Sequence, residues 1–65
     1  MKILIWRVRK SKHISLRELS SKTGIGKTTI NDLENQKNSP TLMQLESIAK
    51  ALECRITDLY ESDYK

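Results

Sequence analysis

Apolar residues along this chain recur at steps of three and four, which is the pattern of amphipathic helices. The first such segment predicts a helix over about Lys2–Lys12. Its inward face carries Met1, Leu4, Ile5 and Val8. No segment alternates at a period of two with β-branched residues, so no strand is predicted. We therefore expect an all-α fold.

The segment after this helix carries the signals of a helix with sharp ends. Ser15 and Glu18 have the spacing of a capping box, in which each side chain bonds the other residue's backbone N–H. The second helix is predicted over Leu16–Thr23. It ends at Gly24, because glycine accepts the left-handed backbone conformation that closes many helices.

A third helix is predicted three residues later. Gly26 suits its N-cap position, and the helix is expected over Lys27–Asn35, with Ile30 and Leu33 facing inward. A polar loop follows from Asn35 to Pro40, because proline is unlikely inside a helix and common just before one.

Two more helices complete the predicted fold. Thr41 and Gln44 have the spacing of a second capping box. A fourth helix is predicted because Leu42, Leu45, Ile48, Ala49 and Leu52 recur at steps of three and four residues. A short fifth helix over about Thr57–Glu61 would bury Leu59.

The size and composition narrow the class of protein. The 65 residues are enough for one domain, residues 1–65, and a domain this small buries only about 60% of the surface of its unfolded chain. No nucleophile–base set or paired-carboxylate cleft can be assembled, so an enzyme is not expected. The single Cys54 cannot form an internal disulfide, and no signal peptide or membrane-length apolar run is visible. We expect a soluble cytoplasmic protein without a cofactor.

Charge is distributed unevenly along the chain. Residues 1–40 hold nine Lys and Arg against three acids, a net charge of +6, and residues 41–65 hold three against five, a net charge of −2. A basic half suits a face turned toward a polyanion such as nucleic acid. Charge alone fits a solvated surface without a partner equally well.

Residues 15–35 have the layout of a helix-turn-helix. Two helices are joined by a glycine-containing turn of about three residues, Gly24–Gly26. In that arrangement the second helix can enter the major groove of DNA while the first crosses the backbone. Spacing alone is a moderate signal, because other helix pairs share it.

Five stretches of the chain make the interpretation specific. They are Ile14 to Leu19, Thr23 to Ile25, Thr29 to Asn35, Ser39 to Leu42, and Leu45 to Leu52. Together they resemble the phage-repressor-like helix-turn-helix family, also called the Xre family. The resemblance implies a five-helix lambda-repressor-like fold, double-stranded DNA as the partner, dimeric binding to a palindromic operator, and transcriptional regulation, usually repression.

The resemblance also implies roles for individual residues. The base-contacting positions are Lys27, Thr28, Asn31 and Asp32. Among them, Lys27 suits guanine and Asn31 suits adenine, while Asp32 would accept from cytosine or point away. The phosphate-contacting positions are Thr29, Asn35, Lys37 and Asn38. Leu16 stands where the family often has a Gln that supports a backbone contact, so either Arg17 takes that role or the contact is absent.

Three further implications concern the scaffold. Arg9 and Glu34 stand where the family often has a partly buried ion pair, since a charge inside a small domain needs a partner. Thr23 replaces a usual Leu and thins the core. Gln36 and Glu53 replace glycines that commonly end helices, which predicts strain or a different build at those two ends.

Two motifs are expected to be coincidental. The segment Gly24 to Thr28 looks like the end of a phosphate-binding loop, but Ser21 stands where that loop needs glycine and no strand precedes it. His13 has no nearby Cys or His, so no metal site is expected.

Four apolar or aromatic residues fall outside the expected core: Ile3, Trp6, Tyr60 and Tyr64. The C-terminal tail can fold back over Ile3 and Trp6, which we favour slightly, or this surface can meet a second subunit or another protein. A homodimer would use the domain's own surface, around the fifth helix and the loop before it. An alternative function is therefore an antitoxin or a partner-controlled interaction module on the same fold.

Overall fold

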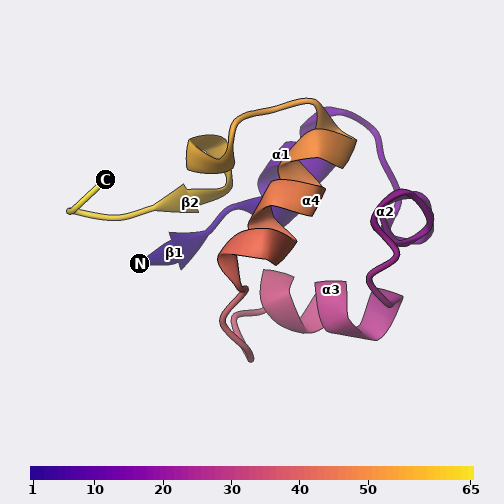
Figure 1. The fold of residues 1–65 in the computed structure, drawn as a ribbon, viewed down its shortest axis with the longest axis horizontal. Helices are drawn as coiled ribbons and strands as arrows, with labels where there is room; N and C mark the ends of the chain where they lie inside the picture. Colours follow the sequence, from indigo (N-terminus) through magenta and orange to yellow (C-terminus); the bar gives the residue numbers. More distant parts are fainter.

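The computed structural model describes residues 1–65, and four α-helices make up most of it (Figure 1). The elements in chain order are β1 (Lys2–Ile3), α1 (Ile5–Ser11), α2 (Leu16–Thr23), α3 (Lys27–Glu34), α4 (Leu42–Leu52), the 3-10 helix η1 (Ile56–Leu59) and β2 (Tyr60–Glu61). In Figure 1, α3 lies along the lower edge of the molecule with α1 and α4 above it and α2 at one end. Both chain termini lie at the opposite end, beside the strands.

One apolar core joins all four α-helices to η1. Its nine buried residues are Ile5, Leu19, Ile30, Leu33, Leu45, Ile48, Ala49, Leu52 and Leu59. Four of them come from α4, which makes this helix the main packing partner of the others. Because Ile30 and Leu33 turn one side of α3 into the core, its other side must face solvent.

The capping signals predict where α2 and α4 begin. The hydroxyl of Thr41 accepts from the N–H of Gln44, and the Gln44 side chain accepts from the N–H of Thr41, both at 3.0 Å. At α2 only half of the predicted box is present. Ser15 Oγ accepts from the N–H of Glu18 at 3.0 Å, while the Glu18 carboxylate lies 3.5 Å from Lys22 Nζ instead.

The expectation of five helices and no strand is wrong at the two ends of the chain. β1 and β2 form an antiparallel pair in which Lys2 lies opposite Glu61 and Ile3 lies opposite Tyr60. In place of a fifth α-helix over Thr57–Glu61, the chain makes the 3-10 helix η1 and then enters β2. Two-residue strands are too short to show alternation, and their pairing depends on segments far apart in the sequence.

This strand pair also changes the start of the first helix. α1 begins at Ile5 and not at Lys2, and Met1 is exposed instead of packing in the core. The tail does fold back toward the N-terminus, because Ile3 pairs with Tyr60 and packs against the core. Trp6 stays 55% exposed and Tyr64 98% exposed, so the tail covers Ile3 and leaves Trp6 open.

Several segments end in the left-handed backbone region. Gly24 has a φ of 77° at the end of α2, where glycine pays no steric penalty. Gln36 and Glu53 also have positive φ, 58° and 54°, so of the two alternatives, strain or a different build, these ends show the strained backbone. His13 joins them with a φ of 58°, which the sequence did not indicate. A non-glycine residue in this conformation costs roughly 1–2 kcal/mol.

Glu53→Gly is therefore expected to stabilise the fold. We expect the free energy of unfolding to rise by about 1 kcal/mol, because glycine removes the Cβ clash but gains freedom in the unfolded chain. For a domain of this size that corresponds to a melting temperature higher by about 4–8 °C. Thermal and urea unfolding followed by circular dichroism measure the change.

The matched control for that variant is Glu46→Gly. Glu46 is exposed within α4, where helical backbone favours other residues over glycine. This variant should lose about 0.5–1 kcal/mol. If Glu53→Gly lowers the melting temperature as Glu46→Gly does, the left-handed end of α4 is not strained.

Candidate nucleic-acid interface

The turn between α2 and α3 is built by two glycines and one threonine. Gly24 ends α2 in the left-handed conformation, and its N–H donates to the carbonyl of Ser20 at 2.8 Å. Thr23 Oγ1 donates to the carbonyl of Leu19 at 2.8 Å and accepts from the N–H of Ile25 at 3.1 Å. Thr23 therefore links the end of α2 to the turn, a polar role that a leucine at this position could not have.

α3 presents a polar side to solvent beyond this turn. Lys27, Thr28 and Asn31 are exposed, and their spacing of three and four residues places them on one side of the helix. Their side chains make no hydrogen bond or ion pair within the chain. Asp32 is half-buried and so less accessible than Asn31. This side of α3 is free to contact a partner.

The N-terminus of α3 adds backbone donors to that side. Its N-cap is Gly26, which has no side chain to accept from the first turn, and no side-chain cap bond is present. The N–H groups of a first helical turn have no partner within the helix, and the helix dipole makes this end favourable for anions. Lys27 stands at the same end and adds a positive charge.

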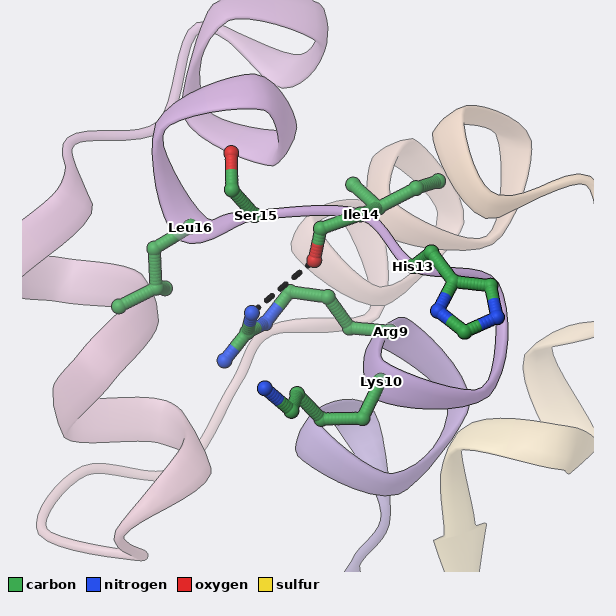
Figure 2. Close-up of a pocket in the computed structure, with 6 residues that line it drawn as sticks. All are labelled: Arg9, Lys10, His13, Ile14, Ser15 and Leu16. Carbon is green, nitrogen blue, oxygen red and sulfur yellow. Dashed lines mark hydrogen bonds between the residues drawn. The ribbon is translucent and has the colours of Figure 1, made fainter.

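An ion pair between Arg9 and Glu34 fixes α3 against the rest of the fold. Arg9 Nε lies 2.8 Å from Glu34 Oε2, and Arg9 Nη2 lies 3.1 Å from Glu34 Oε1. The two side chains are only 8% and 4% exposed. The third donor, Arg9 Nη1, bonds the carbonyl of Ile14 at 3.0 Å, the contact drawn in Figure 2. One guanidinium thus joins α1, the end of α3 and the chain leading into α2.

α2 and α3 are joined by a glycine-containing turn, and α3 is held by the Arg9–Glu34 ion pair and exposed along one side. The profile of the Cro/C1-type HTH DNA-binding domain matches residues 4–63, which is nearly the whole chain. The chain belongs to the Cro/C1-type HTH DNA-binding domain family. No curated protein matches it with significance.

Membership in the Cro/C1-type family makes this chain a DNA-binding protein of the kind that regulates transcription. α2, the turn at Gly24–Gly26 and α3 have the layout that the sequence predicts for its helix-turn-helix. The fold places the predicted contact residues around it. Thr29 and Asn35 are exposed on α3 and at its C-cap, Lys37 and Asn38 are exposed in the loop that follows, and Arg17 is exposed on the neighbouring α2.

Other reactive groups of this Cro/C1-type domain lie apart from the helix-turn-helix. Burial raises the pKa of the Cys54 thiol, Asp58 raises it further, and Lys12 opposes the shift. The thiol therefore stays protonated at neutral pH, whereas the thiolate is the reactive form.

No group of three or more His, Cys, Asp or Glu is placed to hold a metal ion. None of the helices has the length and apolar character needed to cross a membrane.

Proposed function

We propose that residues 1–65 act as one helix-turn-helix domain that represses transcription by binding a palindromic operator as a dimer. The observation that carries this proposal is the exposed side of α3, where Lys27, Thr28 and Asn31 have no partner within the chain. A helix with such a side fits the major groove, in which each base pair presents a distinct set of donors and acceptors.

The base-reading roles follow from the chemistry of each side chain. Lys27 donates to O6 and N7 of guanine, and Asn31 pairs with N6 and N7 of adenine. Thr28 contacts either a base edge or the thymine methyl group. Asp32, on the margin of this side, accepts from N4 of cytosine, because a carboxylate is repelled by phosphates.

A second set of residues holds the duplex without reading its sequence. The residues of this set are exposed on α2, on α3 and in the loop that follows it: Arg17, Thr29, Asn35, Lys37 and Asn38. Contacts of this kind set the register of the protein on the duplex. Those made by Arg17 and Lys37 release counterions from the phosphates, so affinity falls steeply with rising salt.

The length of α3 favours two copies on one operator. Its eight residues span about 12 Å at 1.5 Å per residue. That covers about three to four base pairs at 3.4 Å each, too few to specify a site. Two copies related by a two-fold axis would read half-sites about 34–36 Å apart. A molecule of 31 × 22 × 19 Å fits beside a second copy at that spacing.

Asn31→Ala is expected to relax specificity at one base pair. Loss of a bidentate contact to adenine should cost about 1–3 kcal/mol of binding free energy for the preferred duplex and much less for duplexes changed at that base. Binding is measured against duplexes that differ at single positions. Asn38→Ala is the matched control, since it removes the same side chain from the loop and should weaken all duplexes alike. Equal weakening of every duplex by Asn31→Ala would show that Asn31 does not read a base.

Selection of bound sites from a random duplex library tests the proposal as a whole. The expected outcome is an inverted repeat with its half-sites one helical turn apart. A single motif without a repeat would contradict the dimer, and the absence of any enriched sequence would contradict sequence-specific binding. Repression is tested separately, by placing the selected site across a promoter and measuring reporter output with and without the protein.

A further inference from the structure

A basic strip on one side of α1 adjoins the helix-turn-helix and has no role so far. We define the α1 strip as Trp6, Arg7 and Lys10 of α1 together with Lys2 of the adjoining β1, all of which are exposed. Three of them, Lys2, Trp6 and Arg7, line a hollow at the place where α3 ends. The other polar residues of that hollow are Glu34, Asn35 and Gln36.

The fourth residue extends the strip to the place where α2 begins. Lys10 lines a second hollow with Ile14, Ser15 and Leu16, and Figure 2 shows its side chain running alongside Arg9 while His13 points away. Lys10 Nζ lies 5.9 Å from the centroid of the Trp6 ring. The strip is therefore continuous along α1, from the end of α3 to the start of α2.

The positive charge of the strip is not cancelled locally. Glu34 is the one carboxylate that lines either hollow, and Arg9 already neutralises it at 2.8 Å. Glu61 lies opposite Lys2 across the strand pair, but its carboxylate lies 4.0 Å from Lys65 Nζ. A surface of three cations around an exposed indole attracts a polyanion.

We propose that the α1 strip binds the phosphate backbone of the same duplex, along the flank of each half-site. The inference rests on the proposed function, in which Asn35 and Arg17 contact phosphates near the end of α3 and the start of α2. Arg9 bonds Glu34 at the end of α3 and Ile14 before α2, and residues of the strip line the hollows at both places. Phosphates bound at either place therefore lie within reach of the strip. The lysines and arginine neutralise phosphates, and the Trp6 indole N–H donates to a phosphate oxygen.

The salt dependence of duplex binding tests the two lysines at the ends of the strip. The plot of log affinity against log salt has a negative slope, and each lost phosphate contact makes that slope shallower by about 0.9. Lys2→Gln with Lys10→Gln removes two contacts from each copy, so the slope of a dimer should become shallower by about 3.6. The loss of affinity relative to the wild type then grows about 4000-fold for each tenfold decrease in salt. The preferred base sequence should not change, because these contacts do not read bases.

The matched control removes the same charge elsewhere. Lys22 and Lys50 are exposed and line one hollow with Glu53, and that hollow includes no residue of α3 or of the strip. Lys22→Gln with Lys50→Gln should leave the slope close to that of the wild type. Circular dichroism melting checks that both double variants fold.

Trp6 gives a second readout, since it is the single tryptophan of the chain. Acrylamide quenching of its fluorescence should fall when the duplex is added, as the backbone covers the exposed ring. If the strip variant keeps the wild-type slope and Trp6 stays equally quenchable in the complex, the role of the strip is overturned. The proposed role of α3 is tested separately, because it stands as long as Lys27→Gln weakens binding. If the wild-type protein binds no duplex at low salt, both proposals fail.

Discussion

Replacing Arg9 with Met is expected to lower the free energy of unfolding by about 3–5 kcal/mol, because it leaves the charge of Glu34 buried without a partner. The two side chains are 8% and 4% exposed, so water cannot take over the role of the guanidinium. The variant also leaves the Ile14 carbonyl without its bond to Arg9 Nη1. A small domain has little stability in reserve, so a large fraction of this variant should be unfolded at room temperature.

The double variant Arg9→Met with Glu34→Leu shows whether the unpaired charge is the cause. Two apolar side chains in place of a buried ion pair are often neutral for stability, so most of the loss should be regained. Full recovery is not expected, because the Ile14 carbonyl still lacks its donor. Urea unfolding of the wild type, both single variants and the double variant gives the coupling energy between the two residues. A double variant no more stable than Arg9→Met would contradict the unpaired-charge explanation.

This pair also bears on DNA binding, as a positioning device and not as a contact. Arg9 holds the end of α3 against α1 through Glu34, and it holds the chain entering α2 through Ile14. One guanidinium thus positions both α2 and α3. The double variant is therefore expected to fold but to bind its duplex more weakly than the wild type, because methionine and leucine pack without fixing a direction.

Leu33→Ala is expected to cost about 2–5 kcal/mol of stability, since it opens a cavity where α3 packs on the core. Leu33 is 1% exposed and, with Ile30, gives α3 its buried side. Apparent affinity for DNA should fall with stability, because the fraction of molecules able to bind decreases. Thermal unfolding and duplex titration at one fixed temperature measure the two effects together.

Leu42→Ala is the control for that variant, since it removes the same atoms from a side chain that is 77% exposed at the start of α4. A surface substitution of this kind should change stability by no more than about 0.5 kcal/mol in either direction. Addition of a saturating duplex should partly restore the melting temperature of Leu33→Ala, because ligand binding stabilises the folded state. Equal losses in the two variants would contradict the assignment of Leu33 to the core.

The sequence alone determined the helices whose ends are marked by neighbouring residues. The predicted α2, Leu16–Thr23, agrees with the structure at both ends, because Ser15 and Gly24 mark its start and finish within a few residues. α4 begins where Thr41 and Gln44 cap each other. At Gln36 and Glu53 the resemblance to the family left strain or a different build open, and the positive φ values of the structure decided between them. Signals of this kind act over one helical turn, so the sequence displays them directly.

Only the tertiary structure decided the features that join distant residues. β1 pairs with β2 across almost the whole chain, and this pairing moved the start of α1 to Ile5 and left Trp6 exposed beside Lys10. The resemblance to the family suggested a partner for Arg9 in Glu34, but its third bond, to Ile14, is visible only in the folded chain. A two-residue strand has no period, and the surroundings of a side chain depend on elements that the sequence does not place next to it. Packing therefore brings the α1 strip beside α3, whereas α3 itself could be predicted from the order of the residues.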